Sequence, residues 1–383
     1  MTRVAVSELV LQWAVERSGK PDAIALRFPK LGEWLRGESR PTMRQLEAFA
    51  RATTTPLGYL FLPEPPVERL PMPHFRTVGD DPAQSPSPDL LETVQTMERR
   101  QAWMREYLVE QGHEPLEFAG SAEITEEPVR LAQDMKRTLG LVQNWTARQP
   151  TWSAALRELQ RKIEEAGILV VVNSVVGNNN HRKLEVGEFR GFVLADEHAP
   201  LVFVNGADGK AAQMFTLAHE MAHIWFGSSA AFDLRELQPA DDETELACNR
   251  VAAEFLVPGG ELLQLWPIVQ QQHDRFQAIA RHFKVSELVS ARRAQDLGLV
   301  DRREFLAFYN EYRDSEQRTA AQGQEGGNFY ATQNFRLGRP FAEAVLRAVR
   351  EEKLLFREAY GLTGLYGKAF TGYATFLGSG AVA

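Results

Sequence analysis

Two histidines four positions apart, with a glutamate after the first, are the residues best suited to chemistry: His219-Glu220-Met221-Ala222-His223. Residues four apart lie on the same face of an α-helix, so both imidazoles can reach one metal ion. Zn²⁺ takes imidazole ligands at this spacing in peptidases, and the glutamate beside them can act as a general base. We therefore predict a zinc site with His219 and His223 as ligands and Glu220 as the catalytic residue.

A third protein ligand is expected downstream, because a catalytic zinc ion takes three protein ligands and keeps one position for water. Glu243, Glu245 and Asn249 lie 20–26 residues after His223. Glu245 and Asn249 are four apart and share a helix face. We predict that Glu245 binds the metal and that Asn249 orients a ligand imidazole by a hydrogen bond. Glu243 is the alternative ligand.

The predicted mechanism depends on a water molecule that zinc activates by lowering its pKa toward ~7. Glu220 would accept a proton from this water and pass it to the leaving amine, which predicts a zinc metalloendopeptidase. Residues 201–204 closely precede the histidines, and we expect them to form an edge strand that aligns the substrate backbone. Candidates for stabilising the oxyanion are Arg190, His181 and His198.

Helices must carry these ligands, and strands must lie beside them. Apolar periodicity predicts helices over residues 211–226, which hold both histidines, and 242–257, which hold Glu245. Runs rich in β-branched and aromatic residues predict strands at 168–172, 189–194 and 201–204. Further helices are predicted at 90–111, 128–139, 153–166, 274–283, 286–297 and 301–312, and a polar link at 314–328. The fold class that follows is α+β and mostly helical.

Composition and charge narrow the class of protein. The 383 residues favour two or three domains, and the net charge of −8 excludes a chain that coats nucleic acid along its whole length. Residues 1–62 reverse this balance, with nine Lys or Arg against six Asp or Glu. The sequence has one cysteine and no apolar run of the ~18 residues that a membrane span needs. These features predict a cytoplasmic protein without a membrane segment.

Two segments resemble the ImmA/IrrE family of bacterial metallopeptidases. They are Phe215-Thr216-Leu217-Ala218-His219-Glu220-Met221-Ala222-His223 and the run from Glu245 to Pro258. In the second segment Glu245 takes the family's ligand position, Cys248 stands in place of the usual Ala, and Val251 in place of the usual Phe. We interpret both replacements as apolar core exchanges. The resemblance covers residues 150–300 approximately and implies a small peptidase fold with thermolysin-like zinc geometry and a short sheet.

The N-terminal segment resembles the Xre-type helix-turn-helix domains that precede such peptidases. The resemblance is carried by Lys30-Leu31-Gly32-Glu33-Trp34-Leu35-Arg36-Gly37-Glu38 and Pro41-Thr42-Met43-Arg44-Gln45-Leu46-Glu47, although the stretch before Lys30 is compressed and interrupted by Pro29. It implies DNA binding through a recognition helix. The candidate contacts are Arg27, Lys30, Arg36, Arg40 and Arg44. A helical protein-interaction module is the alternative.

Four parts follow along the chain. We predict an Xre-like helix-turn-helix domain at 1–62, a Pro-rich linker at 63–88, an ImmA/IrrE-like metallopeptidase domain with flanking helices at 89–313, and a C-terminal helical unit at 329–380.

The resemblance implies a DNA-binding regulator that cleaves a partner protein, a repressor or toxin encoded nearby, in stress response, mobile-element control or a toxin–antitoxin setting. Homodimerisation is left open. The alternative is a DNA-binding regulator or antitoxin whose peptidase fold is a sensor or scaffold without proteolysis. Glu220 favours the enzyme, because a scaffold has no chemical need for a general base beside the metal.

Overall fold

The computed structural model describes residues 3–68, 86–228, 230–232, 243–319 and 329–378. The described residues form two compact units, one comprising residues 3–68 with 86–95 and the other residues 96–378. Helix α5 (Pro88–Glu110) contributes to both. None of the helices in the described ranges combines the length and apolar character that crossing a membrane requires.

The N-terminal unit is built from short helices. They are α1 (Glu8–Arg17), α2 (Pro21–Arg27), α3 (Leu31–Leu35), α4 (Met43–Ala52) and the 3-10 helix η1 (Leu57–Phe61). Helix α4 begins at a capping box, in which Thr42 and Gln45 each bond the other's backbone N–H. Phe28, Trp34 and Phe49 pack together in the core of this unit.

A four-stranded sheet lies at the centre of the second unit. Strand β1 (Leu169–Asn173) pairs in parallel with β3 (Leu201–Asn205), and β2 (Gly191–Leu194) pairs antiparallel with both β3 and β4 (Ala230–Phe232). The strand order is β1-β3-β2-β4. Our prediction of an edge strand at 201–204 is therefore wrong, because β3 lies between β1 and β2 while β4 forms an edge. All residues of β1, β2 and β3 are buried, as in strands covered on both faces.

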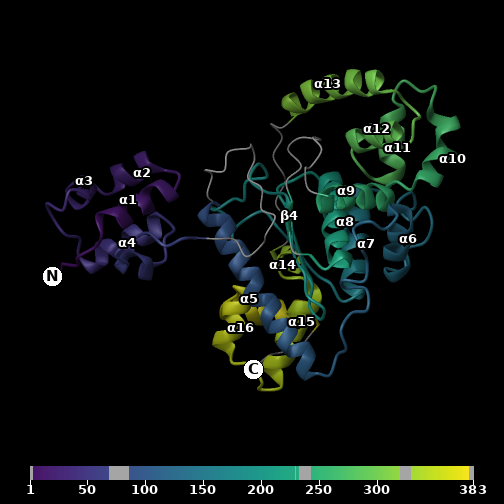
Figure 1. Cartoon of the computed structure of the whole chain (residues 1–383). Helices are drawn as coiled ribbons and strands as arrows, with labels where there is room; N and C mark the ends of the chain where they lie inside the picture. Colours follow the sequence, from purple (N-terminus) through teal and green to yellow (C-terminus); the bar gives the residue numbers. More distant parts are fainter. Residues whose placement is uncertain (1–2, 69–85, 229, 233–242, 320–328, 379–383) are drawn as a thin grey trace. The chain divides into compact units, whose positions relative to one another are not determined.

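Twelve further helices lie in the described part of the second unit. They are α6 (Pro128–Thr138), α7 (Trp152–Glu165), α8 (Lys210–Phe226), α9 (Glu243–Leu256), α10 (Gly259–Val269), α11 (Arg275–Phe283), α12 (Glu287–Asp296), α13 (Arg302–Thr319), α14 (Phe329–Leu337), α15 (Arg339–Arg350), α16 (Phe356–Thr363) and α17 (Lys368–Phe376). Helices α7 and α8 pack against the sheet, and α9 packs against α8 (Figure 1).

Two helices differ from the sequence-based expectation. Helix α10 was not predicted, because Pro258-Gly259-Gly260 is typical of the end of a helix. In the structure these residues also begin the next helix. Pro258 is the N-cap of α10, and the N–H of Gly259 donates to the Glu254 carboxylate. Helix α13 continues to Thr319, so the start of the predicted 314–328 link is helical; residues 320–328 lie outside the described residues.

Helix α8 is buried on all sides, with every residue from Gln213 to Trp225 inaccessible. Two carbonyls of its last turn also accept hydrogen bonds from a crossing segment. The N–H of Gly120 donates to the carbonyl of Ile224, and the N–H of Ala122 donates to that of Trp225. Gly227 then ends the helix in the left-handed conformation with φ of 68°. The helix that carries both histidines is thus fixed at its C-terminal end by residues about a hundred positions earlier.

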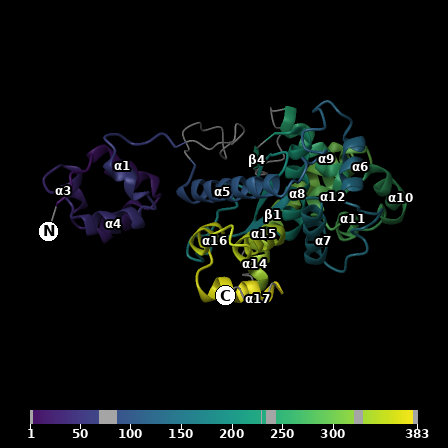
Figure 2. The ribbon, with the colours of Figure 1, turned by 90° about the horizontal axis from the view of Figure 1, so that it is seen from below.

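The C-terminal helices α14–α17 lie beside β1 and α5 (Figure 2). The buried guanidinium of Arg100 on α5 joins two of them, because its Nε donates to the carbonyl of Leu362 and its Nη1 to that of Arg336, both at 2.9 Å. These carbonyls lie in the last turns of α16 and α14, where a helix favours a cation. Burial lowers the pKa of Arg100 to about 10, so the side chain stays charged at neutral pH.

Replacing Arg100 with methionine is expected to loosen α14 and α16. The apolar side chain leaves the carbonyls of Leu362 and Arg336 without this donor. Each unsatisfied carbonyl lowers the free energy of unfolding by ~1–3 kcal/mol. Part of this loss is offset, because methionine buries no charge. Backbone hydrogen exchange in both helices should accelerate. The control is Arg99→Met at the exposed neighbouring position, expected within ~0.5 kcal/mol of wild type. Equal exchange in the two variants would show that Arg100 does not hold the C-terminal helices.

Candidate metal centre

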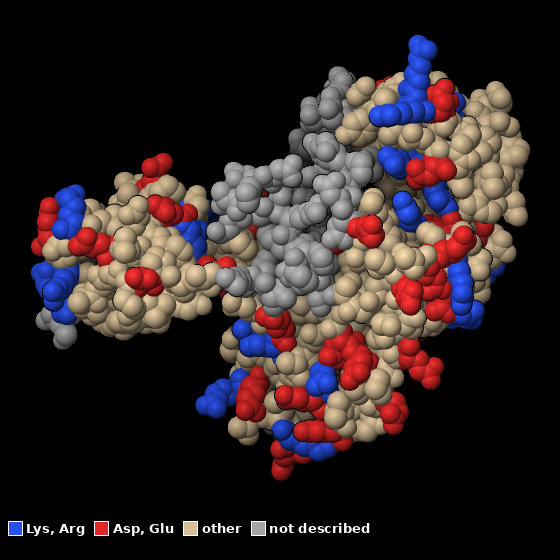
Figure 3. All heavy atoms as spheres, viewed as in Figure 1, with Lys and Arg blue, Asp and Glu red and all other residues tan. Residues whose placement is uncertain are grey.

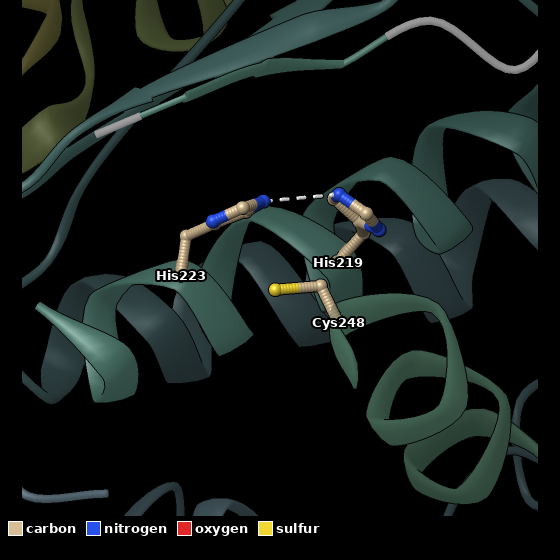
Figure 4. Close-up of side chains that lie close together, drawn as sticks. All are labelled: His219, His223 and Cys248. Carbon is tan, nitrogen blue, oxygen red and sulfur yellow. Dashed lines mark hydrogen bonds between the residues drawn. The ribbon is translucent and has the colours of Figure 1, made fainter. Parts of the chain in front are cut away.

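Two histidines of α8 and one glutamate of α9 converge on one point. The Nε2 atoms of His219 and His223 are 3.2 Å apart, and the Glu245 carboxylate oxygens lie 3.1 Å from the first and 3.3 Å from the second. Both imidazoles are fully buried. Figure 4 shows the two rings directed toward each other from successive turns of α8. The structure therefore brings together the three residues predicted as ligands, whereas the alternative, Glu243, is exposed in the first turn of α9.

The outer nitrogen of each imidazole has its own partner. Nδ1 of His219 lies 3.1 Å from Oδ1 of Asn249, the residue predicted for this role. Nδ1 of His223 lies 3.0 Å from Oγ of Ser228, which sequence reasoning missed. Gly227 could have predicted this contact. A glycine that ends a helix in the left-handed conformation turns the following residue, here Ser228, back toward the last turn of the helix. An Nδ1 proton held by these oxygens leaves Nε2 as a lone-pair donor in both rings.

Burial sets the charge state of the cluster. It lowers the pKa of His219, with Glu245 acting in the opposite direction, so the neutral imidazole that binds metals is favoured. Burial also acts to raise the pKa of Glu245, but the neighbouring His219 and His223 outweigh burial and hold that pKa well below its usual value. The centre thus places an ionised Glu245 carboxylate beside the neutral imidazole of His219.

Glu220 lies beside this cluster and is fully buried. Among the described residues, neither of its carboxylate oxygens has a hydrogen-bond partner. Burial raises the pKa of Glu220, and the negative charge of Glu245 raises it further. A buried carboxyl of raised pKa is suited to exchanging protons near neutral pH. The arrangement can therefore supply a general base next to three ligand atoms.

Gly191 in β2 makes room for helix α8. A Cβ at this position would overlap the methyl group of Thr216, lie 2.8 Å from the carbonyl oxygen of Phe203 and lie 3.4 Å from Oε1 of Glu220. Helix α8 can therefore approach the sheet closely only because residue 191 has no side chain. The close packing of α8 on β2 at Gly191 therefore helps to position α8, the helix that carries Glu220.

Exchange of Gly191 for alanine is expected to destabilise the second unit by ~1–3 kcal/mol, the usual cost of overpacking a core. Thermal or denaturant unfolding measures this loss. Gly260→Ala is the matched control, since a Cβ there meets nothing within 4 Å and helical alanine is favoured over glycine. A Gly191→Ala protein as stable as the control would contradict the proposed close packing of α8 on β2.

The cluster also contains Cys248 of α9. One nitrogen from each histidine and the Cys248 sulfur all lie within 4.8 Å of one another. Figure 4 shows the sulfur directed toward the space between the two histidine side chains. We predicted this residue in the apolar core, and it is fully buried there, but its sulfur also lies near the two histidines.

The three oxyanion candidates lie on connecting segments. Arg190 precedes Gly191, and its guanidinium is held by Asp208 at 3.1 Å. His198 lies in the connection between β2 and β3, and His181 is exposed in the loop after β1. Arg190 therefore already has a carboxylate partner.

The predicted DNA contacts belong to the N-terminal unit. Arg27, Lys30, Arg36, Arg40 and Arg44 are all exposed. Arg36 forms an ion pair with Glu38 at 2.7 Å. On the face shown in Figure 3, Lys and Arg side chains of this unit are interspersed with Asp and Glu. In the second unit, Arg292 forms an ion pair with Asp296, and Arg293 forms one with Glu254.

Comparisons with known families cover two parts of the chain. A search of curated proteins found no match. Residues 337–376, which include α15–α17, match a domain of unknown function (DUF8813). Residues 163–295, which contain the sheet and the whole metal centre, match the family model of the IrrE N-terminal-like domain. This match supports the resemblance to the ImmA/IrrE family and indicates that this part of the chain is a domain of the metallopeptidase type.

Proposed function

We propose that this protein is a zinc-dependent endopeptidase whose metal is held by His219, His223 and Glu245. The supporting observation is the spacing of the ligand groups: the two Nε2 atoms are 3.2 Å apart, one Glu245 oxygen lies 3.1 Å from that of His219, and the other lies 3.3 Å from that of His223. Tetrahedral zinc with bonds of ~2.0–2.1 Å places neighbouring ligand atoms about 3.3–3.4 Å apart. The residues therefore fit this metal. A set of two imidazoles and one carboxylate also leaves one coordination position for water.

Each residue has a distinct task in the reaction. Bound zinc supplies a Lewis acid that polarises the scissile carbonyl and makes water more acidic. Asn249 and Ser228 keep the Nε2 atoms of the histidines directed at the metal position. Glu220 accepts a proton from the attacking water and delivers it to the leaving amine. The buried surroundings strengthen each of these electrostatic interactions.

The substrate we propose is a protein, a repressor or toxin encoded nearby, bound as an extended segment. β4 supports this, since it pairs with β2 on one side and lies at an edge of the sheet. An extended peptide can add to such an edge through backbone hydrogen bonds. β4 thus takes the role that sequence analysis gave to β3.

Incubation of the zinc-loaded protein with candidate partners tests this function. Mass spectrometry should find new peptide termini in the substrate, lost on chelation and restored by added zinc. Intact candidates under all conditions, from a protein that binds zinc, would favour the second reading: a regulator or antitoxin that uses the fold as a sensor or scaffold. The full burial of His219, Glu220 and His223 favours that alternative.

We further propose that residues 1–62 bind DNA in the cytoplasm, with Arg27, Lys30, Arg36, Arg40 and Arg44 as contacts. The local excess of basic residues and their exposure support this. The single cysteine fits a reducing compartment.

Arg44→Ala is expected to weaken duplex binding and to reduce the slope of log affinity against log salt by ~1, because one phosphate contact is lost. Arg36→Ala should have a smaller effect, since Glu38 already neutralises Arg36. Fluorescence anisotropy across a salt series measures both. Arg350→Ala, at an exposed position of α15, is the control. Binding that falls with Arg350→Ala and not with Arg44→Ala would move the DNA site to the C-terminal helices.

A further inference from the structure

Cys248 belongs to the hydrophobic core, and its sulfur also lies beside the two histidines of the candidate metal centre. It lies on α9 three residues after Glu245 and one before Asn249, and both of these residues reach the imidazoles of α8. On a helix, positions three and four apart share a face, so Cys248 belongs to the same face as Glu245 and projects toward the same helix. The sulfur and one nitrogen from each of His219 and His223 lie within 4.8 Å of one another (Figure 4).

The chemistry of the side chain fits a metal ligand. Two imidazoles and a thiolate form a donor set that zinc takes readily, with Zn–S bonds of ~2.3 Å. The Cys248 sulfur would therefore add a third donor to the two imidazoles. A site with four protein ligands is closed, whereas a catalytic site needs an open position for water.

We infer that Cys248 is a fourth protein ligand of the metal, and that its sulfur closes the centre in a resting state of the protein. The inference rests on the zinc site proposed above. When the sulfur–metal bond forms, the thiol loses its proton to solvent and a water molecule leaves the metal. When water returns, the sulfur takes up a proton again. No oxidant or reductant is needed, and the centre changes between closed and open by ligand exchange alone.

Cobalt substitution tests the inference, because cobalt(II) bound by thiolate has a charge-transfer band in the near ultraviolet. Cys248 is the only cysteine of the chain, so such a band has a single source. Wild-type protein loaded with cobalt should show the band. Cys248→Ala should lose it completely while still binding one cobalt ion, seen in its visible bands. Azide should shift the visible bands of Cys248→Ala, where a position is open, and leave those of wild type unchanged.

The outcomes separate this inference from the proposed function. Wild-type protein that binds cobalt without the charge-transfer band overturns the role of Cys248 and leaves the peptidase site standing. Wild-type visible bands that shift on addition of azide overturn the closed resting state. A wild-type protein that binds no cobalt overturns the metal site and the inference together. The wild-type spectra decide each case, so the result stands even where Cys248→Ala fails to fold.

Discussion

Replacing His219 with alanine is expected to reduce the zinc content from about one ion per chain to background, because a single catalytic site binds one ion. His219 lies at the centre of the cluster, with Nε2 3.1 Å from Glu245 and 3.2 Å from the second histidine. Its loss leaves no pair of imidazoles on α8. Elemental analysis after zinc loading and dialysis measures the content, and circular dichroism checks the fold. His181→Ala, an exposed histidine outside the cluster, is the control.

The same measurement separates the two acidic candidates on α9. Glu245→Ala should weaken zinc binding by more than the ~10–100-fold typical of residues that only orient a ligand. Glu243→Ala should leave affinity unchanged, since this side chain is exposed. Competition with a chelator gives both affinities. Loss in Glu243→Ala with retention in Glu245→Ala would reassign the third ligand, and retention in His219→Ala would remove the site altogether.

Glu220→Gln is expected to reduce cleavage by ~10²–10⁴-fold, the usual contribution of general acid–base catalysis. Glutamine keeps the size of the side chain but does not accept the proton of the attacking water. The Glu220 carboxylate forms no hydrogen bond with any described residue, so the exchange breaks none of the described bonds. Zinc content and partner binding should therefore stay at the wild-type level. Cleavage is followed by the size of a co-expressed partner protein.

Zinc content must be measured on the same Glu220→Gln sample, because loss of metal would also abolish cleavage. Asn249→Ala is a useful comparison, since it should weaken metal binding and leave the proton acceptor intact. Cleavage at the wild-type rate in Glu220→Gln would contradict the assigned base. Cellular function that survives this exchange and is lost on deletion of residues 1–62 would favour the scaffold reading.

Local sequence was sufficient to predict the elements that carry the ligands. The spacing of His219 and His223 matches the helical repeat, and the apolar residues around them have the same period, so α8 was expected within one residue of its bounds. The spacing of Glu245 and Asn249 placed both on one face of α9 for the same reason. Strands β1 and β3 were recognisable as short β-branched runs. These features depend on residues within one or two turns of each other.

Tertiary structure alone decided the features that depend on distant residues. The lateral order of strands comes from long-range pairing, so the sequence adjacency of β3 and α8 led to a wrong edge strand. Ser228 reaches His223 only through the turn at Gly227, and Arg100 meets carbonyls more than two hundred residues away. The sequence pattern of α9 predicts only that Cys248 is a buried apolar residue. The packing of α9 against α8 is what brings its sulfur to the two histidines. Helical periodicity predicts which side chains share a face, whereas the packing of the helices determines what that face contacts.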